Sequence, residues 1–383
     1  MGKERYKLTV EPITCVHIGN GTELNPLDYL LSENEKTGRT LYVVYDTDSI
    51  LKRIAVDRQK SVQFESISSD MASLVKFFHR EFKADLDLKY TCSVTREFDN
   101  NYDALSNKDP LENGRFVQQM YRPEGSRYPV IPGSSIKGSI RTAVLNTLLD
   151  NYNKKSELRA LKDDNIQKTL LNNYRDAKQD PFRSVEIGDC EFETKGCQLV
   201  GAIKNVKYDR MKEETVEHNS SIVQAEVIRG KLTYKQNPKE ILGNAVVRIN
   251  ADLVSKSLNE TGVTMKISME EIIKSCNEFY LAQFKNEYDK FYKNSYSSNA
   301  ESITELYKEL KAIAGSESNT FILRVGRWSQ VEFVTYEHEL RNPKTPKKNG
   351  KIMPYGTTRW VFNNDGQYLP LGWCKCTLTP LED

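Results

Sequence analysis

The stretch Tyr128-Pro-Val-Ile-Pro-Gly-Ser-Ser-Ile-Lys-Gly-Ser-Ile-Arg-Thr-Ala143 decides the fold that the sequence predicts. Pro132-Gly133 breaks a short strand, and Ser134 or Ser135 can cap the helix that follows. This helix is predicted from apolar residues at helical spacing, which are Ile136, Ile140, Val144, Leu145 and Leu148. The segment therefore predicts a strand, a tight turn and a helix in direct succession.

The same turn is a candidate anion site. A glycine turn that leads into a helix start presents free backbone N–H groups and the positive end of the helix dipole. Lys137 and Arg141 are four residues apart and share one helix face just beyond it. Residues 125–149 include three basic residues and no acidic one. This favours a phosphate site over a plain helix start with solvated cations. The candidate residues are Gly133, Ser134, Ser135, Lys137, Gly138 and Arg141.

An ATPase phosphate loop is excluded at this position. That motif needs Gly-x-x-x-x-Gly-Lys-Ser/Thr, with the lysine directly after the second glycine. Here Gly138 is followed by Ser139, and the lysine precedes the glycine.

Strands and helices alternate outward from this segment. Strand patterns occur at 6–13, 41–45, 185–192, 198–204, 224–234, 245–249, 321–325, 331–336, 358–362 and 373–378. Helical patterns occur at 69–82, 266–292 and 303–314, and 150–180 reads as a charged surface insertion. No long parallel strand–helix–strand periodicity is present. The pattern predicts an α+β fold of two units, 1–183 and 184–383, with helical insertions near 150–180 and 266–314.

Composition excludes several classes of protein. The chain has 383 residues, of which 38% are hydrophobic and 28% charged, so it is long enough for two or three domains with buried cores. No apolar run approaches the length of a membrane span, and the start of the chain lacks a secretion signal, so we expect no membrane partner. Seven scattered cysteines suit a reducing cytoplasm. With a net charge of only +2, nucleic-acid binding requires local clusters of cations.

Two further basic places lie in the second half. Arg324-Val-Gly-Arg327-Trp328 combines arginines that can grip phosphate with a tryptophan that can stack on a base. A strand end with a core tryptophan is an equally good interpretation. Residues 341–364 contain six cations and no acid, and an all-cation loop suggests contact with a polyanion. The candidates there are Lys344, Lys347, Lys348 and Arg359.

His17 lies in a turn-rich stretch after the first strand. It can serve as a general acid–base group for RNA cleavage, or as a hydrogen-bonded turn residue that contacts ligand. Cys374 and Cys376 alternate along a strand, and Cys190 and Cys197 lack the spacing of a zinc knuckle. We therefore expect no metal and no cofactor.

Four motifs together carry a family resemblance. Pro12-Ile-Thr-Cys-Val-His-Ile-Gly-Asn-Gly21 resembles the opening of RAMP proteins of type III CRISPR systems, and residues 131–143 resemble their strand-turn-helix signature. Gly356-Thr-Thr-Arg359 and Leu369-Pro-Leu-Gly-Trp373 resemble the tail of the fifth-subunit family of type III-A Csm complexes. The motifs span residues 12 to 373. One departure is that the C-terminal loop, typically glycine-rich in the family, has a single glycine in residues 324–330.

The resemblance implies two RRM-like, ferredoxin-like units that bind CRISPR RNA, cap its 3′ region in the Csm complex and are needed for its maturation. It adds His17, Asn20 and Gly21 to the RNA-binding candidates. Expected partners are CRISPR RNA, the neighbouring backbone RAMP subunit, the small subunit and host nucleases. We expect no catalysis. The alternatives are a metal-independent endoribonuclease with His17 as acid–base and Lys137 as charge stabiliser, and a subunit that only bridges proteins.

Overall fold

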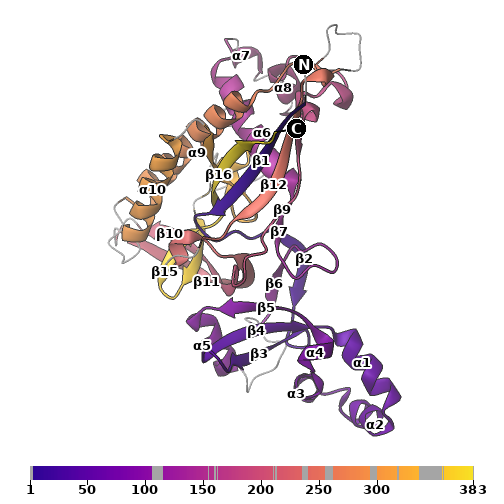
Figure 1. The fold of residues 1–383 in the computed structure, drawn as a ribbon. Helices are drawn as coiled ribbons and strands as arrows, with labels where there is room; N and C mark the ends of the chain where they lie inside the picture. Colours follow the sequence, from indigo (N-terminus) through magenta and orange to yellow (C-terminus); the bar gives the residue numbers. More distant parts are fainter. Residues whose placement is uncertain are drawn as a thin grey trace.

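Two β-sheets lie one above the other in an elongated molecule (Figure 1). The computed structural model describes residues 3–105, 115–153, 155–158, 161, 163–209, 211, 214–234, 240–254, 262–293, 300–316, 319–335, 356 and 358–382. The larger upper part carries long helices beside its sheet, and the smaller lower part carries short helices around β3, β4 and β5 (Figure 1).

The upper sheet takes strands from both ends of the chain. Its order is β13-β16-β1-β12-β9-β7, and β8 also pairs with β12. The strands are β1 (Lys3–Pro12), β7 (Val130–Ile131), β8 (Val185–Ile187), β9 (Cys190–Glu191), β12 (Gly243–Asn250), β13 (Thr320–Arg324) and β16 (Trp373–Pro380). Leu8 and Val10 of β1 are buried, whereas Lys7 is exposed and Thr9 is partly exposed, so one face of β1 is in the core.

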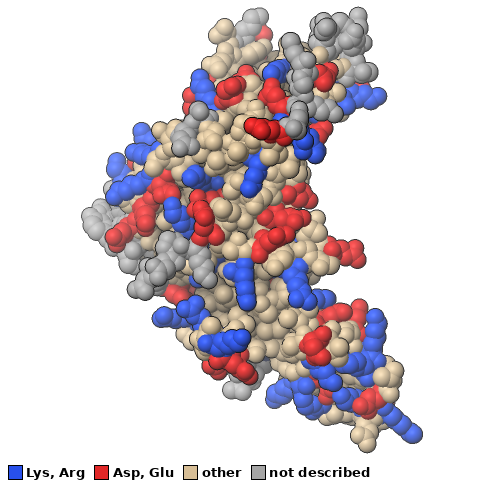
Figure 2. Space-filling view, in the orientation of Figure 1, with Lys and Arg blue, Asp and Glu red and all other residues tan. Residues whose placement is uncertain are grey.

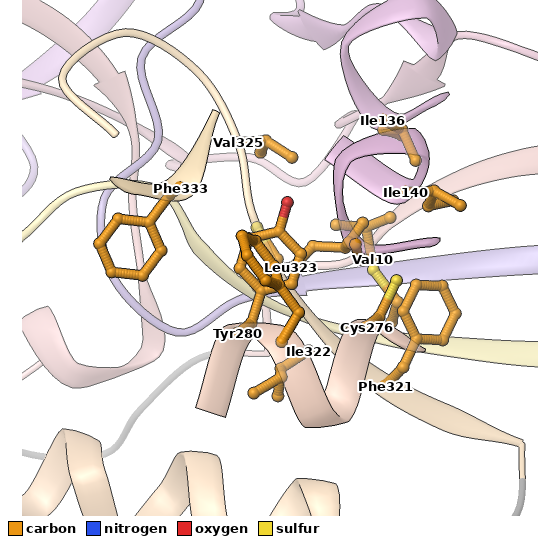
Figure 3. Packing of buried hydrophobic residues seen from close by; sticks show 14 of the residues in the cluster. Val10, Ile136, Ile140, Cys276, Tyr280, Phe321, Ile322, Leu323, Val325 and Phe333 are labelled. Carbon is orange, nitrogen blue, oxygen red and sulfur yellow. The ribbon is translucent and has the colours of Figure 1, made fainter. Parts of the chain in front are cut away.

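Three helices pack against the buried face of this sheet: α6 (Gly133–Asp150), α9 (Met269–Phe291) and α10 (Ala300–Ala314). Ile136 and Ile140 of α6 and Tyr280 of α9 meet around β13 (Figure 3). Each such buried apolar side chain stabilises the fold by roughly 1.5–3 kcal/mol. The aromatic stripe predicted between residues 266 and 292 is therefore confirmed as core packing.

The charged stretch at 150–180 contributes to the core, contrary to the prediction. It forms α7 (Lys155–Leu158) and α8 (Asp163–Leu170), followed by the 3₁₀ helices η1 (Ala177–Gln179) and η2 (Pro181–Ser184). Ile166 and Leu170 are four residues apart, and this narrow apolar stripe is enough to bury both against the cluster around α6.

The lower sheet has the order β2-β6-β11-β10-β5-β4-β3, with β14 pairing β10 and β15 pairing β14. Its strands are β2 (Gly19–Leu24), β3 (Tyr29–Asn34), β4 (Arg39–Tyr45), β5 (Leu88–Val94), β6 (Val117–Met120), β10 (Gln198–Asp209), β11 (Glu214–Ile228), β14 (Arg359–Asn364) and β15 (Gln367–Pro370). The helices are α1 (Thr47–Val56), α2 (Arg58–Ile67), α3 (Met71–Glu81), α4 (Ala84–Asp87) and α5 (Arg96–Leu105). Three more 3₁₀ helices complete the elements: η3 (Lys231–Thr233), η4 (Ala251–Leu253) and η5 (Val331–Phe333).

The predicted α+β class is confirmed. Neither sheet is confined to one side of residue 183, so the division into units at that residue stays a prediction. The strand predicted at 331–336 is wrong over Val331–Phe333, which forms η5. Phe333 there packs edge-on against Trp373, with ring centroids 5.4 Å apart, so the apolar residues serve the core from a helical turn.

A buried ionic network joins the two sheets through α9. Glu287 of α9 is almost fully buried and pairs with Arg324 of β13 at 2.9 Å and with Arg359 of β14 at 2.8 Å. Arg359 also pairs with Glu332 of η5 at 2.9 Å. Arg324 Nε donates to the carbonyl of Leu371 at 2.9 Å. β13 belongs to the upper sheet and β14 to the lower sheet, so one carboxylate fixes both relative to α9.

Replacing this carboxylate should strongly destabilise the protein. Glu287→Gln leaves two buried guanidinium groups facing a neutral amide, which should lower the free energy of unfolding by about 3–5 kcal/mol. Glu309→Gln is the matched control, because it breaks a partly exposed pair with Lys231 and should cost less than about 1 kcal/mol. Chemical denaturation measures both, and equal losses would contradict the role given to Glu287.

Candidate nucleic-acid interface

A groove of about 600 Å³ brings together three of the sequence-predicted segments. It lies where the start of β2, the first turns of α6 and the turn after β13 converge. The lining residues are Ile18, Gly19, Gly21, Ser134, Ser135, Gly138, Ser139, Thr142, Gly326, Arg327, Phe333 and Val334. Gly21, Ser134, Ser135, Gly138 and Arg327 were predicted from sequence. Residues separated by more than 300 positions therefore share one concave surface.

The helix start that borders the groove differs from the prediction. Helix α6 begins at Gly133 with Pro132 as its N-cap, and neither Ser134 nor Ser135 caps it. The Gly133 amide donates to Asp189 Oδ1 at 2.8 Å. A side chain at Gly133 would place Cβ 2.0 Å from the Ile187 carbonyl oxygen, so only glycine fits. Asp189 thus accepts from the first amide of the helix, and the two serines line the groove.

Lys137 and Arg141 lie on a neighbouring face of α6. The groove is lined by Ser134, Gly138 and Thr142, which follow one another at four-residue intervals. Arg141 pairs with Asp180 at 2.9 Å, and its guanidinium lies 5.0 Å from the ring centroid of Phe182. It therefore fastens α6 to η2.

Lys137 is half-buried, and its pKa is lowered by that burial, with the nearby Asp180 carboxylate acting in the opposite direction. Among the residues that the structure describes, no carboxylate lies within 4.0 Å of its ammonium. Of the predicted pair of cations, Lys137 is thus the one left available to an anion.

His17 is fully buried behind the groove. Its Nδ1 donates to the backbone carbonyl of Glu226 at 2.7 Å, and its Nε2 has no hydrogen-bond partner among the described residues. Burial lowers its pKa to about 4. The ring lies 4.9 Å from that of Trp328, and the His17 carbonyl accepts from the Arg327 amide at 2.9 Å. His17 therefore joins β11 to the turn that carries Arg327, through its ring on one side and its backbone carbonyl on the other.

The two arginines of Arg324-Val-Gly-Arg327-Trp328 have opposite roles. Arg324 is buried with Glu287, whereas Arg327 is exposed at the groove and donates to Gln118 Oε1 at 2.8 Å. Gly326 adopts φ +92°, and a Cβ there would lie 2.4 Å from the His17 carbonyl oxygen. The turn therefore needs this glycine to bring Arg327 to the groove.

The other predicted RNA-contact residues lie in different surroundings. Arg324 and Arg359 are ion-paired core residues, because Glu287 and Glu332 approach them from segments that the local sequence does not reveal. Trp328 is half-buried against Trp360, which favours the core interpretation. Asn20 lies beside the groove, bonded to Gln119. Lys344, Lys347 and Lys348 lie outside the described residues.

The sequence analysis missed a second buried ionic centre under the groove. Glu226 is fully buried in β11 and pairs with Arg122 at 2.6 Å, and Tyr90 donates to Glu226 Oε1 at 2.8 Å. The available signal was an acidic residue within the apolar run Ala225-Glu226-Val227-Ile228. On the face shown in Figure 2, basic and acidic side chains are interspersed, without one continuous basic field.

Two features are absent from the described part of the chain. No group of three or more His, Cys, Asp or Glu side chains is arranged to hold a metal ion. None of the described helices combines the length and apolar character that a membrane span requires.

The comparisons with known proteins identify the family. The model of the RAMP superfamily matches residues 9–358. The chain therefore belongs to the RAMP superfamily, and its α+β architecture is the two-unit, ferredoxin-like fold of that class. No curated protein matches the sequence.

Two solved structures resemble the chain over nearly its whole length. One is a chain of the cryo-EM structure of a Csm–crRNA–target RNA ternary complex of a type III-A CRISPR-Cas system, with a TM-score of 0.61, 17% identity, and coverage of 98% of this chain and 100% of that chain. The other is the crystal structure of T. onnurineus Csm5, with a TM-score of 0.55, 18% identity, and coverage of 96% and 99%. At this level of identity the likeness establishes the fold.

The burial of His17 predicts a pH dependence of stability. Its pKa is about 4 in the folded protein and near 6.5 when unfolded, so the unfolded chain binds more protons between these values. Stability should therefore fall as the pH falls through this window, by up to about 3 kcal/mol from His17. His17→Gln keeps a donor for the Glu226 carbonyl and should remove most of that loss. Denaturation at pH 7 and pH 4 tests this, and parallel losses in both proteins would contradict it.

Proposed function

We propose that this chain is the RNA-binding RAMP subunit of a type III-A Csm effector complex, where it caps the 3′ region of CRISPR RNA and is needed for its maturation. The observation that carries the proposal is the groove, in which both RAMP-like motifs, residues 12–21 and 131–143, face Arg327. The full-length likeness to Csm chains supports the choice of complex. Its partners would be CRISPR RNA, the neighbouring backbone RAMP subunit, the small subunit and host nucleases, all in the cytoplasm.

The lining of the groove suits recognition of an RNA backbone of any sequence. Gly19, Gly21, Gly138 and Gly326 present backbone without side chains, and the serines supply hydroxyl groups. Such groups contact phosphate and sugar, and these contacts position RNA without reading its bases. Ile18 and Val334 add apolar surface for a sugar or an unstacked base. A subunit that must accept every spacer sequence needs this combination.

The proposed role is non-catalytic. The runner-up role, an endoribonuclease with His17 as general acid–base, requires an imidazole that reaches RNA and titrates near neutrality. His17 is enclosed and its pKa is lowered to about 4, so no observation favours that role. Lys344, Lys347 and Lys348 remain proposed supporting contacts to RNA.

Arg327 is the cation on which the groove should most depend. Arg327→Ala should weaken binding of single-stranded RNA about ten- to a hundredfold, because a charge-assisted phosphate contact contributes about 1.5–3 kcal/mol. The loss should be equal for unrelated sequences, and the salt slope should become shallower by about one unit. Arg58→Ala in the distant helix α2 removes the same charge and is the matched control (Figure 1). Equal effects of the two variants would place RNA elsewhere.

Alanine variants of Lys137 and Arg141 should differ in their effects on melting temperature and RNA binding. Lys137→Ala should leave the melting temperature unchanged and weaken RNA binding. Arg141→Ala should lower the melting temperature, because it removes the contacts with Asp180 and Phe182. Both substitutions retain a good helix former. Thermal unfolding and RNA binding are to be measured on the same samples, and wild-type RNA affinity in Lys137→Ala would remove Lys137 from the interface.

A further inference from the structure

The wall of the groove formed by β2 is only loosely built into its sheet. Strand β2 is an edge strand that pairs with β6 alone, through Gly19 with Met120 and Glu23 with Gln118. Between these two pairs, β2 covers four residue steps, from 19 to 23, whereas β6 covers two, from 120 to 118. Strand β2 therefore has a bulge at residues 20–22. These residues are exposed, and Gly21 of the bulge lines the groove. Side-chain contacts must therefore determine the shape of the bulge.

A directed chain of hydrogen bonds connects this bulge to the buried carboxylate of Glu226. The Thr22 amide donates to Asn20 Oδ1 at 2.9 Å, and Asn20 Nδ2 donates to Gln119 Oε1 at 2.6 Å. Gln119 Nε2 donates to the Tyr90 hydroxyl at 2.9 Å, and this hydroxyl donates to Glu226 Oε1 at 2.8 Å. Every donor in the chain points towards Glu226.

The buried end of the chain sets this direction. A carboxylate can only accept, and Glu226 also accepts from Arg122 and from the Met120 amide at 2.9 Å. Tyr90 must therefore donate to Glu226 and offer a lone pair to Gln119. That choice turns the Gln119 amide so that its oxygen faces Asn20, which in turn leaves Asn20 Oδ1 for the Thr22 amide. The guanidinium of Arg122 lies 3.7 Å from the Tyr90 ring centroid and holds the ring in place.

We propose that Tyr90 is a positioning residue for RNA binding: through Gln119 and Asn20 it holds the β2 bulge in the shape that receives the RNA backbone. The inference rests on the proposed function of the groove. Tyr90 lies in β5, in the lower part of the molecule, and need not touch RNA itself. Tyr90→Phe removes the hydroxyl link of the relay without changing charge.

Tyr90→Phe tests the role, with Tyr42→Phe as the matched control. Tyr42 is fully buried in the adjacent strand β4, and its hydroxyl has no hydrogen-bond partner among the described residues. Tyr90→Phe should weaken single-stranded RNA binding about five- to tenfold with an unchanged salt slope, because no phosphate contact is lost. It should also accelerate hydrogen exchange of the amides at 20–22. Tyr42→Phe should change neither quantity.

A double-mutant cycle distinguishes positioning from general loss of structure. Asn20→Ala should weaken binding, and adding Tyr90→Phe to it should weaken binding no further, because the relay is already broken. Independent losses in the double variant, or unchanged exchange at 20–22 in Tyr90→Phe, would overturn the inference. Faster exchange with unchanged RNA affinity would also overturn it if Arg327→Ala still weakens binding. If Arg327→Ala has no effect either, the proposed function fails, and the positioning role falls with it.

Discussion

The pairing of Glu287 with two buried arginines is the constraint on which the two-sheet arrangement depends. Arg324 comes from the upper sheet and Arg359 from the lower sheet, so one carboxylate on α9 forms ion pairs with both sheets. The same network controls the groove, because Arg324 precedes the turn that carries Arg327, and Glu332 precedes Phe333 in the lining. Desolvation of these charges is costly, and the network offsets that cost only when every partner is in place. The geometry of the interface is therefore tied to the core.

A second buried carboxylate, Glu226, serves a different purpose. It lies in β11, the strand next to β6 in the lower sheet, and accepts from Arg122, Tyr90 and the Met120 amide. Glu287 holds elements together, whereas Glu226 orients polar groups that reach the surface through Gln119. A connected polar network of this kind favours one arrangement, because a reversed Gln119 amide would no longer donate to the Tyr90 hydroxyl.

The groove relies on shape more than on charge. Glycines at positions 19, 21, 138 and 326 let a ligand approach the backbone closely, and Arg327 is the one cation among the described residues of the lining. This agrees with a net charge of only +2 and with the mixed distribution of charge in Figure 2. A binder of this type gains orientation from hydroxyl and amide groups, and it avoids the sequence preference that base-edge contacts would introduce.

The sequence by itself determined the α+β class, the strand-turn-helix at 128–143, the core stripe of α9 and the family, because these depend on local periodicity and on short motifs. It also singled out Gly21, Ser134, Ser135, Gly138 and Arg327, which the fold assembles in one groove. Only the tertiary structure decided which cations are available. Arg324 and Arg327 are three residues apart, yet one is buried against Glu287 and the other lines the groove. The same holds for His17, whose burial depends on β11 and on the turn at Gly326. The position of a charge in a sequence carries no information about the distant partner that removes it from water, and that partner is set by packing.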